Sequence, residues 1–172
     1  MTWQTLEIKS SSLILKPFTA EDADEIFNCI TPNLTRYMSW EPPQNRQVFA
    51  ATWQQWLRNI DHKTELTLVI RNINNNEFVG LTALHQVQSE TPELGIWIRE
   101  DRHGSGFGRS TIKALVEWAS IHFHIKHFIY PVAVENTASR RIAESLGGTV
   151  YEQIQKPKYD AVTYAIPLSK TV

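Results

Sequence analysis

The chain has 172 residues, of which 42% are hydrophobic, with 17 basic against 18 acidic side chains and a formal net charge of −1. This length corresponds to a single domain over residues 1–172, and the composition is too apolar and too nearly neutral for a disordered chain. Attraction to nucleic acid or to an anionic membrane through bulk charge would need a basic excess. None is present, so we expect neither partner.

The N-terminal segment, the cysteine and the histidines exclude several classes of protein. Residues 1–16 contain no basic region followed by a long apolar stretch, and no run approaches the ~18 apolar residues of a membrane span. The single Cys29 can form neither an internal disulfide nor a CxxC motif, which favours a cytoplasmic location. His122, His124 and His127 have no carboxylate or thiol between them, so no zinc site is expected.

Apolar spacing in the first part of the chain predicts one strand, two helices and a hairpin. Residues 12–17 alternate as a strand does, and residues 20–30 carry apolar side chains at helical spacing behind an acidic first turn. A second helix is predicted over about residues 46–60, after an aromatic loop at residues 35–43 that contains two prolines. An Asn-rich turn at residues 72–77 predicts an antiparallel hairpin.

The rest of the chain alternates strands with two further helices. The predicted helices, at residues 112–123 and 137–146, each show an apolar stripe, and a Gly-Gly pair ends the second. Strands are predicted at residues 66–70, 78–87, 91–100, 128–134, 149–155 and 159–168. The whole pattern predicts a mixed α/β (α+β) fold, in which helices flank a mostly antiparallel sheet of about six or seven strands.

Three of only seven glycines, Gly104, Gly106 and Gly108, lie within five residues of one another. The cluster separates a predicted strand from a predicted helix. A helix N-terminus offers free N–H groups to an anion, and glycines let a bulky anion approach the backbone closely. Arg102 and Arg109 flank the cluster and add positive charge. The sequence therefore predicts a site for a phosphate or pyrophosphate group.

The spacing argues against the two common nucleotide-binding loops. A Walker A motif needs Gly-Lys-Ser/Thr, whereas Arg109 follows Gly108 and the next lysine is Lys113. A GxGxxG dinucleotide fingerprint needs a third glycine at position 109 and an acidic residue about twenty residues later. No acidic residue occurs between Glu117 and Glu135. A nucleotide-binding protein of another fold is therefore the less favoured interpretation.

The segment HGSGFG at residues 103–108 resembles the R/Q-x-x-G-x-G/A loop of the GNAT acyl-CoA-dependent N-acetyltransferases. Downstream, Asn136 and Ser139 match an Asn and a Ser that face the pantetheine arm in that family. Upstream, LILKPFTAEDADEIF, TRYMSWEPP and ELGIWI are similar to the RimJ/RimL branch of ribosomal-protein N-terminal acetyltransferases. The resemblance covers nearly the whole chain in the right order.

The resemblance implies acetyl-CoA as co-substrate, a primary amine as acceptor and no metal. It places the coenzyme against Trp97, Ile98, Arg99, His103, Gly104, Ser105, Gly106, Phe107, Gly108, Arg109, Asn136 and Ser139. Two positions depart from the family pattern. Gly148 replaces the usual Phe, so the last helix is expected to pack differently, and Pro131 interrupts a strand, which predicts a bulge or an edge there.

Acetyl transfer from a thioester to an amine needs a neutral amine, a polarised carbonyl and a proton for the departing thiolate. The resemblance implies that a backbone N–H of residues 97–99 meets the carbonyl oxygen. Ser139 either protonates the leaving sulfur or caps its own helix. Glu93 and His85 are the candidate bases, with a solvated strand carboxylate and a surface histidine as the alternatives.

Tyr37, Trp40 and Trp97 are the expected walls of the acceptor site, with core packing as the alternative. The lack of an obvious strong base favours an amine of low pKa. At pH 7 an α-amine of pKa ~7.7–8.0 is about 10–15% neutral, and a lysine of pKa ~10.4 is less than about 0.1% neutral. A protein N-terminus is therefore the favoured acceptor, bound by a monomer or homodimer. A small-molecule amine, or an acyl-CoA sensor without turnover, remains open.

Overall fold

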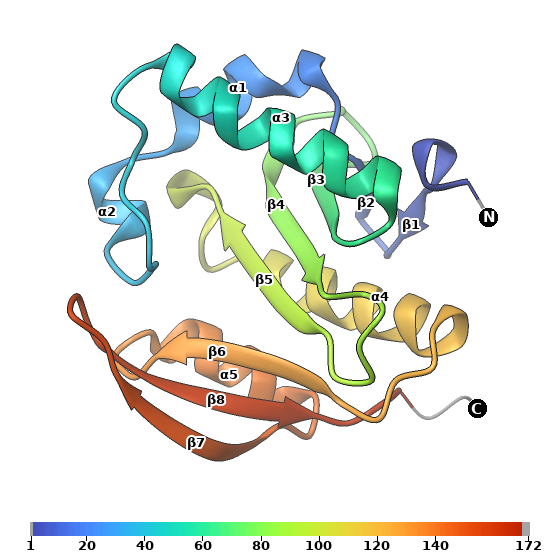
Figure 1. Ribbon diagram of the computed structural model, residues 1–172, viewed down its shortest axis with the longest axis vertical. Coiled ribbons are helices and arrows are strands. Elements are labelled where there is room, and N and C mark those ends of the chain that lie inside the picture. Colours follow the sequence, from blue (N-terminus) through green and yellow to red (C-terminus); the bar gives the residue numbers. More distant parts are fainter. Residues whose placement is uncertain (1, 170–172) are drawn as a thin grey trace.

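The computed structural model describes residues 2–169 and contains one eight-stranded sheet, in the order β1-β2-β3-β4-β5-β6-β8-β7 (Figure 1). The strands are β1 (Ile8–Lys9), β2 (Leu13–Pro17), β3 (Leu66–Asn72), β4 (Phe78–His85), β5 (Glu93–Ile98), β6 (Phe128–Ala133), β7 (Thr149–Gln155) and β8 (Asp160–Ile166). The helices are α1 (Ala23–Cys29), α2 (Pro32–Thr35), α3 (Arg46–His62), α4 (Phe107–His122) and α5 (Thr137–Ser145), with 3-10 turns η1 (Trp3–Thr5), η2 (Ala20–Asp22) and η3 (Glu100–Arg102). All neighbouring strands are antiparallel except β5 and β6, which are parallel.

The predicted α/β class and order of elements are confirmed, and the sheet has one strand more than predicted. The additional strand β1 has two residues, which is too short to show an alternating pattern. The single turn α2 was also not predicted. It begins at Pro32 and is capped by Thr31, whose hydroxyl oxygen accepts from the Leu34 N–H at 3.1 Å. The predicted helix at residues 20–30 is divided into η2 and α1.

Helices cover both faces of the sheet. In Figure 1, α3 lies in front of the upper strands, and α4 passes behind β4 and β5. The α4 stripe predicted from the sequence is confirmed, because Ile112, Leu115, Val116 and Ala119 are all buried. Within residues 2–169, no helix combines the length and the apolar character that crossing a membrane requires.

The sheet divides between β5 and β6. Their pairing consists of one residue pair, Glu93 with Ile129, and the strands then separate, as Figure 1 shows. β6 continues through Pro131, which pairs with Thr163 of β8 in regular register, so Pro131 marks an unpaired strand edge and not a bulge. The Ile129 N–H donates to the Pro92 carbonyl on the β5 side at 3.0 Å. Alternation along the strand therefore puts the missing N–H of Pro131 on the side of the gap.

Candidate active site

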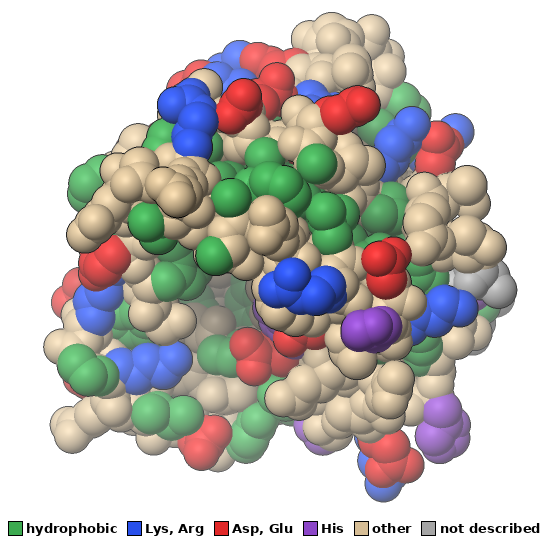
Figure 2. Space-filling view, turned by 45° about the horizontal axis from the view of Figure 1, so that its top comes forward, with side chains coloured by type: hydrophobic (Ala, Val, Ile, Leu, Met, Phe, Trp, Pro, Cys, Tyr) green, Lys and Arg blue, Asp and Glu red, His purple; other side chains and the backbone are tan. Residues whose placement is uncertain are grey.

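A cleft of ≈ 880 Å³ occupies this gap and extends to the loop between α2 and α3. Both halves of the sheet line it, with Glu93 and Trp97 from β5, Pro131 from β6 and Tyr151 from β7. Figure 2 shows the molecule hollowed on this face, with acidic side chains beside the opening. The volume lies within the range of about 300–1,000 Å³ that is usual for small-molecule sites.

The glycine cluster lies at the N-terminus of α4 and presents free backbone N–H groups. Gly104 and Gly106 have φ values of +80° and +76°, and Gly106 is the N-cap residue of the helix. A Cβ atom at either position would meet nothing within 4 Å, so the backbone is open to a ligand. Across the part of the chain that the structure describes, the six N–H groups of residues 104–109 donate to no protein acceptor. These donors make an open cradle at the positive end of a helix, which is an arrangement that can bind a phosphate group.

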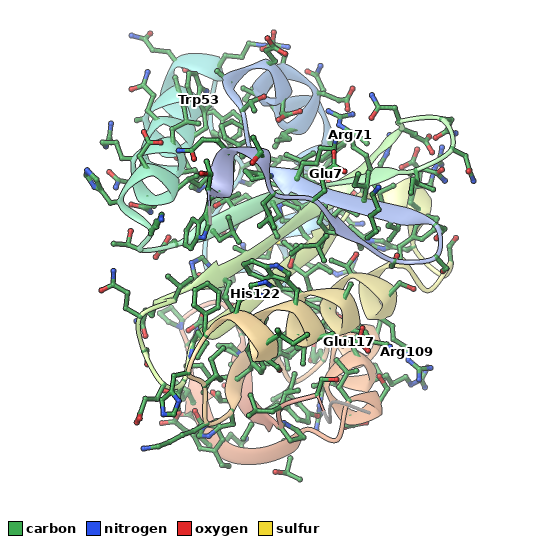
Figure 3. All side chains as sticks on the ribbon, turned by 90° about the vertical axis from the view of Figure 1, so that its right-hand side faces the viewer. Glu7, Trp53, Arg71, Arg109, Glu117 and His122 are labelled. Atoms are coloured by element: carbon green, nitrogen blue, oxygen red, sulfur yellow. The ribbon has the colours of Figure 1, made fainter. Side chains whose placement is uncertain are left out.

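Two residues predicted to serve the anion have other partners. A Cβ atom on Gly108 would lie 2.8 Å from Ile142 Cδ1, so this glycine allows α4 to pack closely on α5. Arg102 Nε donates to the Glu77 carboxylate at 3.1 Å, which compensates its charge. Arg109 has no ion-pair partner among the described residues, and Figure 3 shows it extending away from the N-terminal end of α4. The uncompensated positive charge beside the cradle is therefore that of Arg109.

Of the three residues expected to meet the thioester carbonyl, only Ile98 turns its backbone toward the gap. The Arg99 N–H donates to the Val79 carbonyl of β4 at 2.9 Å. Because N–H directions alternate along an antiparallel strand, the Trp97 N–H also points to β4, and the Ile98 N–H points to the gap. His103 Nε2 lies 2.7 Å from the Ile98 carbonyl oxygen, which ties the glycine loop to β5.

Asn136 and Ser139 lie together at the start of α5 and line the cleft. Asn136 is the N-cap residue, and its Oδ1 accepts from the Ser139 N–H at 3.2 Å. The Ser139 hydroxyl does not cap the helix, because it lies 2.5 Å from the hydroxyl of Tyr130. Tyr130 is 2% exposed, and burial raises its pKa to about 12. The protonated phenol therefore holds the serine hydroxyl at the wall of the cleft.

His85 and Glu93 pair across the register of β4 and β5, and both line the cleft. His85 Nδ1 lies 3.3 Å from Glu65 Oε2, at the side of the cleft. Glu93 makes no ion pair or hydrogen bond through its carboxylate with any of the described residues. Its charge nevertheless acts on Tyr151. Burial raises the pKa of the Tyr151 phenol, and the negative charges of Glu152 and Glu93 raise it further. The structure thus brings both candidate bases into one site.

The three aromatic residues expected in the acceptor site, Tyr37, Trp40 and Trp97, also line the cleft. Trp40 is 39% exposed, whereas Trp97 is 8% exposed and meets the Phe78 ring edge-on at 5.8 Å between centroids. Trp97 therefore belongs to both the core and the cleft wall, whereas Tyr37 and Trp40 belong to the α2–α3 loop.

A lysine from the β7–β8 turn holds the α2–α3 loop in place. Lys158 Nζ donates to the carbonyl oxygens of Thr35 at 2.8 Å and Trp40 at 3.3 Å. It also forms an ion pair with Glu41 at 2.7 Å. The loop that carries the acceptor-side aromatic residues is therefore fixed to the far end of the sheet.

Sequence reasoning missed Tyr130 and Tyr151, which line the cleft, and Glu65 and Lys158, which contact the lining residues His85 and Trp40. None of the four belongs to a recognisable motif. The alternation of apolar residues in β6 does place Tyr130 on a buried face, and this is the one signal that could have found it. In residues 2–169 no group of three or more His, Cys, Asp or Glu side chains is arranged to hold a metal ion.

The sequence model of the acetyltransferase (GNAT) domain matches residues 12–149, which is most of the chain. The chain belongs to the GNAT family. This match confirms the resemblance drawn from the glycine loop and its flanking segments. A curated relative, the uncharacterized N-acetyltransferase YoaA of Bacillus subtilis (strain 168), is 22% identical over 143 residues, which are 81% of each chain.

Solved GNAT structures share the fold. RimL, an α-N-acetyltransferase of ribosomal protein L7/L12 solved with coenzyme A, superposes with a TM-score of 0.85 at 18% identity, over 95% of this chain and 98% of RimL. Spermidine N-acetyltransferase from Vibrio cholerae, solved with CoA and spermine, gives a TM-score of 0.80 at 22% identity, over 94% and 98% of the two chains. The named acceptors of these two enzymes differ, so the shared fold does not select an acceptor.

Proposed function

We propose that this protein transfers an acetyl group from acetyl-CoA to a primary amine, by direct attack of the amine in a ternary complex. The observation that carries the proposal is the cradle at residues 104–109, which stands at the N-terminus of α4 and is tied through His103 to Ile98, the last residue of β5, next to Trp97 of the cleft wall. An anion held at the cradle places the rest of its molecule along the gap between β5 and β6. The RimL and spermidine acetyltransferase structures, which contain coenzyme A, support this assignment.

Acetyl-CoA supplies the acetyl group as a thioester that is reactive toward amines. The N–H groups of residues 104–109 and the Arg109 guanidinium bind the pyrophosphate. The Ile98 N–H donates to the carbonyl oxygen as negative charge develops there, which lowers the barrier to attack. Asn136 holds the first turn of α5, and so keeps Ser139 beside the position of the thioester sulfur.

The proton balance assigns roles to the remaining residues. His85 or Glu93 accepts the proton that the acceptor ammonium must lose before its nitrogen can attack the carbonyl carbon. As the new N–C bond forms and the C–S bond breaks, the Ser139 hydroxyl donates to the departing thiolate. Tyr130, protonated because it is buried, supports Ser139 through their short hydrogen bond.

A protein N-terminal α-amine is the acceptor that this site fits best. Deprotonating an α-amine at pH 7 costs only ~1–1.4 kcal/mol, against ~4.6 kcal/mol for a lysine. One weak base or a water molecule can supply the smaller free energy but not the larger one. RimL, which shares the fold, is named for such an acceptor. The aromatic side chains of Tyr37 and Trp40 offer contact area for the first residues of a peptide.

Release of free thiol tests the proposal. Acetyl-CoA should yield free CoA with peptides that have a free N-terminus, and not with the same peptides when the α-amine is blocked and a lysine is left free. Spermidine and an aminoglycoside serve as small-molecule acceptors in the same assay. Binding of CoA without thiol release from any amine would favour the alternative of an acyl-CoA sensor. Failure to bind CoA at all would contradict both.

The two candidate bases are separated in the same assay. The two variants are His85→Ala and Glu93→Gln. The one that removes the true base should lose about 100-fold in kcat, since general bases typically contribute 10²–10⁴-fold. The other variant should stay within about threefold. Equal and small losses in both would assign the proton transfer to water.

A further inference from the structure

Three ionisable side chains form a row across the cleft face of the sheet. His85 of β4 pairs with Glu93 of β5, and on the other side Leu84 pairs with Leu66 of β3. The antiparallel register therefore places Glu65, directly before β3, beside His85, and directly opposite residues share a face. The 3.3 Å separation of His85 Nδ1 and Glu65 Oε2 confirms this placement.

The Glu65 carboxylate is itself held from α3. Asn59 Nδ2 donates to Glu65 Oε2 at 3.0 Å, and this is the same oxygen that faces His85 Nδ1. One carboxylate oxygen thus takes both contacts. The opposite edge of the imidazole lies close to Gly95, because a Cβ atom added to that glycine would lie 3.3 Å from His85 Nε2. A larger residue at position 95 would displace the ring.

We propose that Glu65 is the positioning residue for His85, and that it fixes the proton on Nδ1 so that the Nε2 lone pair faces the cleft and accepts the proton of the acceptor amine. This inference rests on the proposed function and deepens it, because it selects His85 over Glu93 as the base. A carboxylate can only accept, so the Glu65 carboxylate 3.3 Å away favours the tautomer in which His85 Nδ1 carries the hydrogen. When Nε2 takes the proton, the carboxylate stabilises the imidazolium that forms.

The tautomer is measured directly, without any turnover, from the ring-nitrogen shifts of His85 in the ¹⁵N-labelled full chain. At a pH where His85 is neutral, the wild type should show a protonated Nδ1 and an unprotonated Nε2. Glu65→Ala should move the proton largely to Nε2. The matched control is Glu90→Gln, because Glu90 lies 3.8 Å from His124 Nε2 outside the cleft, and it should leave the His85 signals unchanged. A proton on Nε2 in the wild type would overturn the inference.

The kinetic consequence is tested with a double-mutant cycle. Glu65→Ala should lower kcat about 10- to 100-fold with little change in the KM for acetyl-CoA. Glu65→Gln should recover most of that loss, since its amide oxygen can accept both contacts at the same place. In a His85→Ala background, Glu65→Ala should have no further effect beyond about twofold, because it acts through the histidine.

The outcomes separate this inference from the proposed function. Thiol release by the wild type, together with the same Glu65→Ala loss in both backgrounds, would reject the positioning role and leave the transferase intact. Wild-type kcat in a folded Glu65→Ala variant would reject it equally. Thiol release from no amine would reject the proposed function, and the nitrogen shifts would still decide the tautomer.

Discussion

On the proposed coenzyme side of the site, most of the groups that would face a ligand are backbone N–H groups of one continuous loop, residues 104–109, joined by the Ile98 N–H and the Arg109 guanidinium. On the acceptor side they are side chains from separate elements, such as His85 of β4, Glu93 of β5 and Trp40 of the α2–α3 loop. The backbone groups depend on chain conformation and tolerate changes of side chain, which is consistent with His103 standing where the loop pattern of the family has Arg or Gln. Single substitutions should therefore alter the second set of groups and leave the first largely unchanged.

The largest effect should come from breaking the backbone side with Gly106→Asp. Its carboxylate would stand at the anion cradle, at a φ of +76° that aspartate, like asparagine, adopts more readily than other side chains do. We expect at least about 100-fold weaker CoA binding by calorimetry. Gly106→Asn is the matched control, because asparagine has the same shape, tolerates this conformation and lacks the charge, and its loss should stay below about tenfold. Equal affinity of Gly106→Asp and wild type would remove the loop from the site.

A second test addresses the boundary between the two sides, where Ser139 lies. Ser139→Ala should lower kcat about tenfold and leave acetyl-CoA affinity unchanged, because a thiolate leaving group of pKa near ~8.5 needs only modest help from a proton donor. Ser145→Ala removes a hydroxyl from the same helix, where it donates only to the Ile142 carbonyl at 2.7 Å, and should have no effect. A wild-type kcat in Ser139→Ala would exclude the leaving-group role.

A third test loosens the acceptor side alone. Lys158→Met removes the contacts to Thr35, Trp40 and Glu41 that fix the α2–α3 loop. A hydrogen bond from a charged donor contributes about 1.5–3 kcal/mol at most, and exposure of this side chain reduces that contribution. The KM for the amine should therefore rise only about three- to tenfold. The KM for acetyl-CoA should not change. Lys113→Met, which removes a surface pair with Glu117, is the control, and a matching rise in that variant would make the effect non-specific.

The smallest effect concerns the ion pair behind the glycine loop. The hydrogen bond from Arg102 holds the pKa of the Glu77 carboxyl below its usual range. A depressed folded-state pKa contributes stability that is present above the unfolded-state pKa and is lost as the pH falls through the folded-state value. Glu77→Gln should therefore lower the Tm by about 1–2 °C near neutral pH, and this difference should disappear as the pH falls through the lowered folded-state pKa of Glu77. A difference that persists in acid would assign the loss to packing.

The backbone side of the site could be predicted from the sequence because its signals are local. Three glycines in five residues, followed by the apolar stripe of α4, determine a loop and a helix N-terminus without reference to any other part of the chain. Gly108 shows the limit of that reasoning. Its role depends on Ile142 of another helix, and no spacing within the loop distinguishes it from Gly104 or Gly106.

The acceptor side could be predicted only as a set of candidates, because its contacts join distant parts of the chain. His85 was a candidate base, yet its partner Glu65 becomes visible only through the register of β3 and β4. Ser139 was assigned two alternatives, and the Tyr130 contact across β6 and α5 argues against the capping role and leaves the leaving-group role as a prediction. Lys158 lies 123 residues from Thr35, and nothing local predicts that they meet.

Pro131 has a thermodynamic consequence. With no N–H on the side of the gap, β6 cannot extend its ladder with β5, so closing the gap would bury backbone groups without partners. Pro131 therefore favours the separated arrangement of β5 and β6. Binding then requires no strands to be pulled apart, and little of the interaction energy is spent on reorganising the protein.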